Sequence, residues 1–189
     1  MTRKALPVAA FLAACCAGLP AGAAIAQAAP AAAPAASTPA ASQWHAPRPG
    51  LLTGGQPAPG DWAALKAQGV AMVVNLRPDA EMAGRNEAAE VAAAGMAYVG
   101  IPVAGPEAID ADNARRLWSL LKASGGTAFV HCASGNRTGA LLAIGAAHSG
   151  GMTPEAALAF GRAAGLGTLE PLVRERLGIA PAAPATMQP

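Results

Sequence analysis

The sequence has few aromatic residues and few charged ones. Trp, Tyr and Phe make up 4% of the 189 residues and Asp, Glu, Lys and Arg 13%, whereas 53% of the residues are hydrophobic. Much of that hydrophobic fraction is alanine, a strong helix former with a small side chain. A chain of this length supports one domain with a real core. We therefore expect one folded unit whose core is tight and thin, with Ala-rich helices packed closely.

Clusters of basic residues are missing as well. Of the 13 Lys and Arg residues, which stand against 11 Asp and Glu residues, Arg3 and Lys4 lie at the N-terminus. Beyond them the formal charge is balanced and no basic run occurs, which argues against nucleic acid as a partner. The sequence also shows no cluster of metal ligands and no nucleotide-binding glycine motif, so it predicts no cofactor.

Residues 1–26 are typical of a secretory signal peptide. Arg3 and Lys4 precede an apolar run that ends in small residues suited to cleavage, and prolines within the run argue against an uncleaved membrane anchor. Residues 12–15 resemble a bacterial lipobox, which would place a lipid on Cys15. The segment predicts a periplasmic or secreted protein, with a lipoprotein as the alternative. The membrane is then a partner only through the signal segment or that lipid.

Cysteine is scarce, and its distribution favours a functional role for one thiol. Cleavage of the signal peptide removes Cys15 and Cys16 and leaves Cys132 alone, so that no internal disulfide can form. A lone thiol is usually avoided in an oxidising compartment. The presence of Cys132 in a glycine-containing loop therefore points to chemistry, with a buried small hydrophobic residue as the alternative.

Composition divides the rest of the chain into three parts. Residues 27–49 form an Ala/Pro/Ser-rich linker, in which Trp44 and His45 are candidates for docking onto the domain by packing. Residues 50–178 form the domain, and residues 179–189 form a disordered tail. Within the domain, apolar strand-like runs alternate with helical patterns. This alternation predicts an α/β fold with a central, mostly parallel sheet flanked by helices.

The expected elements place Cys132 at a sheet edge that suits chemistry. Strands are expected at 51–53, 70–76, 97–103 and 127–131, and helices at 59–68, 86–94, 110–123 and 138–148, with two more beginning at Thr153 and Thr168. The strand expected at 127–131 ends directly before Cys132, which places Cys132 at the carboxyl edge of the sheet. Ligand sites in open α/β sheets lie at those ends.

The segment HCASGNRTGA, residues 131–140, is suited to activating a thiol. Helix N-terminal amides and the helix dipole stabilise a thiolate, and Gly135 permits the backbone angle that an anion-binding nest of amides needs. Arg137 can bind two oxygens of an oxyanion, and Thr138 can cap the helix or hydrogen-bond the thiolate. His131 should point away from the thiol and orient the loop. The residues expected to hold the oxyanion are Ala133, Ser134, Gly135, Asn136 and Thr138.

Carboxylates at the start of the helix expected at 110–123 could act as a general acid. Asp110 is the first candidate, with Asp112 and Glu107 beside it. Each also fits a structural role, Asp110 as an N-cap and the other two as favourable charges near a helix start.

A second group of polar residues follows the strand at 70–76 and reaches the same sheet edge. Its members are candidates for lining a pocket, namely Asn75, Arg77, Asp79 and Glu81. Pairing of Arg77 with Asp79 or Glu81 inside a turn is the structural alternative.

Together these motifs resemble the cysteine-dependent phosphatase superfamily, and more closely the phosphatase-like domain of the beta-lactamase hydrolase-like family. The resemblance covers roughly residues 50–178. It rests on TGGQP (53–57), VVNLRPDAE (73–81), GMAYVGIPV (95–103) and HCASGNRTGA, in that order. It implies an α/β fold with a central sheet and a cysteine loop that cradles an oxyanion.

The loop departs from the superfamily in its length. Four residues separate Cys132 from Arg137, where protein tyrosine and dual-specificity phosphatases have five. The shorter form is similar to the loop of rhodanese sulfurtransferases, and its narrower cradle favours a single sulfur atom over a tetrahedral phosphoryl group. The beta-lactamase hydrolase-like family shows the same short spacing.

Three functions remain open from the sequence, each with a small anionic or phosphorylated molecule as partner. In a phosphatase, Cys132 attacks phosphorus, Arg137 and the loop amides hold the oxyanion, Asp110 protonates the leaving group, and water cleaves the phosphocysteine. In a sulfurtransferase, the thiolate accepts a sulfane sulfur and becomes a persulfide. In the third, the loop binds an anion without turnover.

Overall fold

The computed structural model describes residues 43–181. The predicted signal segment with Cys15, most of the predicted linker and most of the predicted tail lie outside the described residues. Within residues 43–181, no helix is both long enough and apolar enough to cross a membrane.

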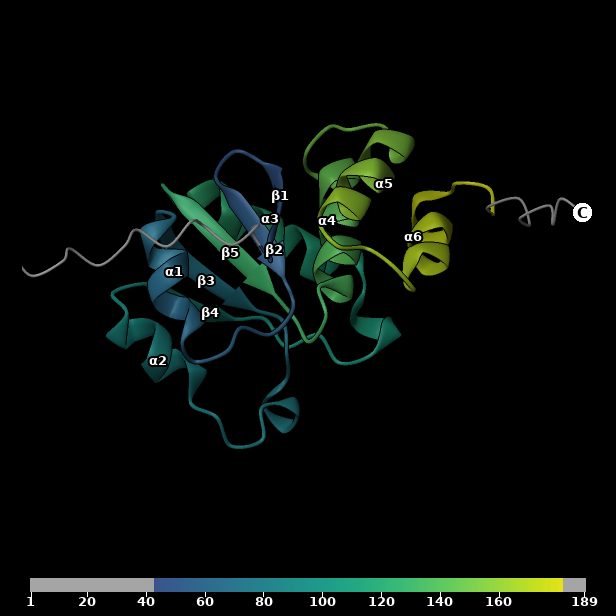
Figure 1. Ribbon diagram of the computed structural model, residues 1–189. Helices are drawn as coiled ribbons and strands as arrows, with labels where there is room; N and C mark the ends of the chain where they lie inside the picture. The colour runs from purple at the N-terminus through teal and green to yellow at the C-terminus, as the bar shows by residue number, and fades with distance from the viewer. Residues whose placement is uncertain (1–42, 182–189) are drawn as a thin grey trace, which may run out of the picture. The chain divides into compact units, whose positions relative to one another are not determined.

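A five-stranded sheet forms the centre of the domain, with the strand order β1-β2-β5-β3-β4 (Figure 1). Its pairs β2–β5, β5–β3 and β3–β4 are parallel, and only β1 runs antiparallel, against β2. The mostly parallel sheet predicted from the sequence is therefore confirmed. The strands are β1 (His45–Arg48), β2 (Leu51–Gly54), β3 (Val70–Asn75), β4 (Ala97–Gly100) and β5 (Thr127–His131).

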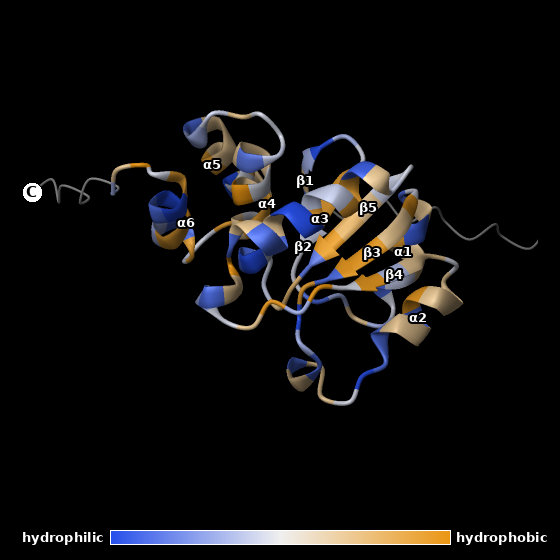
Figure 2. Ribbon diagram, turned by 180° about the vertical axis from the view of Figure 1, so that it is seen from behind, coloured by the Kyte–Doolittle hydropathy of each residue, from blue (hydrophilic) through white to orange (hydrophobic). Residues whose placement is uncertain are grey.

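Helices cover both faces of the sheet (Figure 1). On one face α1 and α2 pack over Val73 and Phe129. On the other face the helices from α3 to α6 pack over Val74 and Val130. Because both faces are buried, the central strands are almost continuously apolar, as Figure 2 shows for β3 and β5. The helices are α1 (Asp61–Ala67), α2 (Glu87–Ala93), α3 (Ala111–Ala123), α4 (Asn136–His148), α5 (Pro154–Ala163) and α6 (Glu170–Leu177), with short 3-10 turns η1 (Asp79–Glu81) and η2 (Pro106–Ala108).

Helix α4 runs through the core and carries the residues that follow the cysteine loop. Its residues from Thr138 to Ala146 are all buried, and the glycines among them let neighbouring chain segments approach closely. A Cβ atom on Gly139 would lie 2.2 Å from the backbone nitrogen of Leu166 and 2.6 Å from the carbonyl oxygen of Gly161. The tight, Ala-rich packing expected from composition thus fixes the first turn of α4.

Two of the predicted helix caps are formed in the structure. Asp110 accepts a hydrogen bond from the backbone N–H of Asn113 and caps α3, and Thr153 caps α5 in the same way. At α4, however, the N-cap position is occupied by Gly135 rather than Thr138, because the helix begins at Asn136. The last helix begins at Glu170, two residues later than predicted.

The sheet begins at His45, ahead of the predicted domain boundary at Gly50. Strand β1 was not expected from the sequence. It lies in a Pro-rich segment, and such a composition is typical of a linker. Pro47 lacks an N–H but is tolerated in this strand, since β1 lies at the edge of the sheet. Trp44 docks as expected, its ring meeting that of Phe129 edge to face at 4.8 Å between centroids.

Candidate active site

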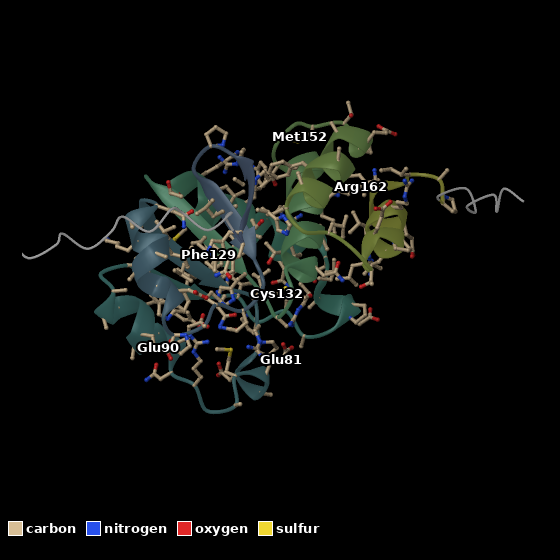
Figure 3. The ribbon with its side chains drawn as sticks, in the orientation of Figure 1. Glu81, Glu90, Phe129, Cys132, Met152 and Arg162 are labelled. Atoms are coloured by element: carbon tan, nitrogen blue, oxygen red, sulfur yellow. The ribbon has the colours of Figure 1, made fainter. Side chains whose placement is uncertain are left out.

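Cys132 lies at the carboxyl end of β5, in the loop that leads into α4 (Figure 3). Its side chain is buried, with 1% of the residue exposed, and it is the one cysteine among the described residues. Gly135 adopts a left-handed conformation with φ of 90°, which turns its N–H toward the sulfur at 3.1 Å from Sγ. The glycine therefore performs the predicted task of shaping the loop.

Backbone amides around the sulfur favour the thiolate. Burial by itself raises the pKa of the Cys132 thiol, but the backbone N–H groups of Thr138, Ser134, Arg137 and Gly135 hydrogen-bond to it and together lower the pKa below its usual value. A lowered pKa increases the thiolate fraction at neutral pH, and the thiolate is the nucleophilic form. The loop thus has the electrostatics of an activated cysteine.

A neighbouring segment pins the cysteine loop in place. The N–H of Cys132 donates to the carbonyl of Gly54 at 3.4 Å, and the N–H of Gln56 donates to the carbonyl of Ala133 at 3.1 Å. Gly55 forms a bridge with Ser134, and a Cβ atom on Gly55 would lie 3.0 Å from the Ala133 carbonyl oxygen. The glycines of TGGQP therefore allow the end of β2 to lie against the loop.

Arg137 is bound by a carboxylate from the loop after β3. Its Nη1 and Nη2 donate to the two carboxylate oxygens of Glu81 at 2.8 and 2.6 Å, and Nη1 also donates to the carbonyl of Val103 at 2.7 Å. The hydrogen bonds from Arg137 lower the pKa of Glu81 below its usual value, and Arg77 adds to this effect. Glu81 is part-exposed, with 36% of its side chain accessible. The guanidinium expected to bind an oxyanion thus holds a carboxylate in this structure.

Two other predicted loop residues, Asn136 and Thr138, differ in their contacts. The side chain of Asn136 donates to the hydroxyl of Thr168 at 2.6 Å and accepts from the N–H groups of Gly167 and Leu169. It therefore ties the loop before α6 to the cysteine loop. Thr138 is buried, and its hydroxyl has no hydrogen-bond partner in the described part of the protein.

His131 lies on the opposite face of β5 from the thiol, as expected. Its ring stacks on Phe129 at 5.5 Å between centroids, and its Nε2 lies 2.8 Å from Oε1 of Glu87 in α2. Both side chains are buried, and the other carboxylate oxygen of Glu87 accepts a hydrogen bond from Gln56. Burial raises the pKa of Glu87, but the contact with His131 and the other partners lower it below its usual value. Sequence reasoning missed Glu87, since an acidic residue at a helix start is ordinary.

The polar residues after β3 divide between structural and pocket positions. Asn75 is buried and accepts from the N–H of Arg77 at 2.8 Å, which shapes the turn. Arg77 donates to Gln56 at 2.6 Å and pairs with Glu81, so the predicted structural alternative for Arg77 is what the structure shows. Asp79 is exposed and lines a different pocket, beside α2.

None of the predicted general acids lines the pocket at the cysteine loop. This pocket has a volume of about 320 Å³, and Glu81 is the carboxylate in its lining. Asp110 caps α3 instead, Asp112 pairs with Arg115 at the surface, and Glu107 is exposed in η2. The pocket is lined by Glu81, Gly105, Pro106, Ala133, Ser134, Asn136, Arg137 and Leu169.

Among residues 43–181, no group of three or more His, Cys, Asp and Glu side chains is placed to hold a metal ion. The site therefore offers a stabilised thiolate, an arginine and one adjacent carboxylate.

Comparison of the sequence with known families agrees with these features. The family model for the phosphatase-like domain of beta-lactamase hydrolase-like proteins matches residues 48–149. A beta-lactamase hydrolase-like protein from Agrobacterium fabrum is 38% identical over 104 residues, which are 53% of this chain and 24% of that protein. A second, from Xylella fastidiosa, is 33% identical over 119 residues, 61% of this chain and 27% of that protein. The chain thus spans about a quarter of the length of these curated relatives.

Solved structures share the fold. A candidate phosphatase from Shewanella putrefaciens is 25% identical, with a TM-score of 0.51 over 62% of this chain and 76% of that one. Another, from Neisseria meningitidis, is 17% identical, with a TM-score of 0.60 over 70% of this chain and 96% of that one. The five-stranded sheet and its helices are therefore those of a cysteine-type phosphatase fold.

Proposed function

We propose, since the chain belongs to the phosphatase-like domain family of beta-lactamase hydrolase-like proteins, that it is a cysteine-dependent phosphatase for a small phosphate ester. The observation that carries this proposal is the position of Cys132 in the loop before α4, where the N–H of Gly135 donates to its sulfur at 3.1 Å. A thiolate held in this way at a helix N-terminus is a prepared nucleophile.

The proposed reaction has two steps. The Cys132 thiolate forms a bond to phosphorus while the bond from phosphorus to the leaving oxygen breaks, and that oxygen takes up a proton. Arg137 and the loop amides hold the phosphoryl oxygens, where negative charge develops. Water then attacks the phosphocysteine, which releases inorganic phosphate and restores the thiolate.

The test is the turnover of an aryl phosphate by the wild type and by Cys132→Ser. The wild type should release inorganic phosphate, and Cys132→Ser should lose this activity entirely. Rapid acid quenching of the wild type during turnover should reveal phosphate bound to the peptide that contains Cys132. A clean, folded wild type without turnover contradicts the proposal.

A sulfurtransferase is the second candidate, and the loop length favours it. With four residues between Cys132 and Arg137, the loop amides point at Sγ itself, as the 3.1 Å contact from Gly135 illustrates. Such a loop also suits a persulfide, in which Sγ carries one further sulfur. The thiolate would take a sulfane sulfur from thiosulfate, release sulfite, and pass the sulfur to cyanide.

Mass spectrometry distinguishes the two candidates. Thiosulfate treatment should add the mass of one sulfur atom to the peptide with Cys132 if the chain is a sulfurtransferase, and thiocyanate should form when cyanide follows. An unmodified peptide excludes this candidate. Phosphate binding without either activity, lost in Arg137→Ala, would instead identify an anion-binding module.

A further inference from the structure

Glu81 contacts the proposed phosphate-binding arginine and lines the same pocket. Its carboxylate and the Arg137 guanidinium form two parallel hydrogen bonds, so the N–H groups that would bind a phosphoryl group already bind a carboxylate. Figure 3 shows Glu81 and Cys132 at the same end of the sheet. An anionic substrate that binds Arg137 therefore has to replace Glu81.

From this geometry we infer that Glu81 is the proton carrier for the leaving group in the phosphatase reaction. The inference rests on the proposed function and names a catalytic residue for it. Glu81 is the only carboxylate lining the pocket beside Cys132 within the described part of the chain. Asp110, which the sequence favoured for this task, has its carboxylate engaged with the N–H of Asn113.

The position of Glu81 allows its side chain to move while its backbone stays fixed. Glu81 ends the short turn η1, and its carbonyl oxygen accepts a hydrogen bond from Nη2 of Arg77. The side chain is part-exposed at the pocket, so its torsions can rotate without disturbing the core. Once the substrate has displaced it, the carboxylate is free to reach the leaving oxygen on the open side of the phosphoryl group.

In this inference, the proton that Glu81 carries to the leaving oxygen comes from the phosphoryl group of the substrate. The charged groups around Glu81 are Arg137 on α4, Arg77 after β3, and the Cys132 thiolate beyond Arg137. While Arg137 binds the carboxylate, Glu81 is ionised. When a phosphate ester monoanion takes over Arg137, Glu81 loses its main partner and faces an anion, so it becomes basic enough to accept the phosphoryl hydroxyl proton.

Glu81 accepts and donates one proton in each of the two steps. The proton passes from the phosphoryl oxygen to Glu81, and then to the leaving oxygen as sulfur displaces it. In the second step Glu81 accepts a proton from the attacking water and passes it to the departing phosphate, and the ionised carboxylate then pairs with Arg137 again. Because phosphate monoesters lose their second proton near pH 6, kcat/KM should fall above about that pH.

The decisive experiment compares Glu81→Gln with the wild type on two phosphate esters. Nitrophenyl phosphate has a leaving group that needs little protonation, whereas an alkyl phosphate needs it strongly. Glu81→Gln should lose about 100-fold or more in kcat on the alkyl ester but less than about 10-fold on the nitrophenyl ester. For Glu81→Gln, kcat/KM should also no longer fall as the pH rises.

Two control variants separate this role from a structural one. Asp112→Asn changes an exposed carboxylate that pairs with Arg115 and should leave both activities unchanged. Asp110→Asn keeps an N-cap and tests the competing acid. An equal loss on both esters in Glu81→Gln, or a leaving-group-dependent loss in Asp110→Asn, overturns the inference while the proposed phosphatase stands. A wild type inactive on both esters overturns both.

Discussion

Two carboxylate pairs flank Cys132, and they differ chiefly in burial. On one side Glu87 meets His131 in the core, where neither side chain has more than 1% of its surface exposed. On the other side Glu81 meets Arg137 at the pocket, with 36% of the carboxylate side chain exposed. A carboxylate paired with a nitrogen base therefore occurs once in a buried site and once in a solvent-accessible one.

This difference in burial distinguishes a pair that supports the fold from a pair that can open for a substrate. Desolvated partners cannot exchange with water or ligand without a large penalty, so the His131–Glu87 pair holds the end of β5 and α2 together. The Arg137–Glu81 pair, with 15% and 36% of its side chains exposed, is partly solvated and costs less to open. Gln56 contacts both sides, donating to Glu87 and accepting from Arg77, so the two pairs share one polar network.

The largest effect is expected on stability from Glu87→Ala. This change leaves the fully buried His131 without its carboxylate partner and removes one acceptor of the part-buried Gln56 amide, which should lower the free energy of unfolding by about 3 kcal/mol or more. Glu81→Ala, the matched change in the solvated pair, should cost about 1 kcal/mol or less. Urea unfolding of both variants measures the contrast. Equal losses would mean that burial does not distinguish the two pairs.

The next effect is expected on activity from Arg137→Lys. A lysine keeps the charge but loses the planar pair of donors, so kcat/KM on an aryl phosphate should fall about 100-fold. Its unfolding free energy should change by about 1 kcal/mol or less, the reverse of the pattern expected for Glu87→Ala. Arg115→Lys at the exposed surface is the control. A stable variant with full activity would remove Arg137 from the proposed chemistry.

A smaller effect concerns acid stability. The folded-state pKa of Glu87 is below its usual value, so the ionised carboxylate contributes stability above the unfolded-state pKa of about 4.3. That contribution is lost as the pH falls from about 4.3 through the folded-state pKa. Urea unfolding between about pH 3 and 7 should therefore show a shallower acid limb in Glu87→Gln than in the wild type. An unchanged slope would show that Glu87 does not carry this dependence.

The smallest effect is expected at a third carboxylate, Glu170, far along the chain from the cysteine loop. Arg162 and Arg174 both bind Glu170 and lower its pKa to about 2. Because the side chain of Arg162 is 49% exposed, Arg162→Ala should cost less than about 1 kcal/mol, and 1 M salt should reduce the loss further by screening. Activity should stay unchanged. A larger, salt-independent loss would show that this surface pair behaves like the buried one.

The sequence predicted the strands that lie inside the sheet because their apolar runs reflect burial on both faces. It did not reveal β1, whose four residues include a proline and gain their order from pairing with β2. It also identified the cysteine loop, because Gly135 and Arg137 are close to Cys132 in the chain.

The site's carboxylates were harder to assign, because their roles depend on contacts between distant residues. Glu87 lies 44 residues from His131, and Glu81 lies 56 residues from Arg137. Asp110 shows the opposite case: its local sequence fits both a helix cap and a general acid, and the hydrogen bond to Asn113 shows that the cap is formed.

The contact of Gly139 with Gly161 and Leu166 bears on how the protein tolerates mutation. Gly139 is two positions after Arg137, and any side chain there would collide with backbone atoms, which cannot rotate out of the way. A substitution at this position would have to move the start of α4, and the guanidinium would move with it. A residue that contacts no substrate thus restricts which sequences can carry this active site.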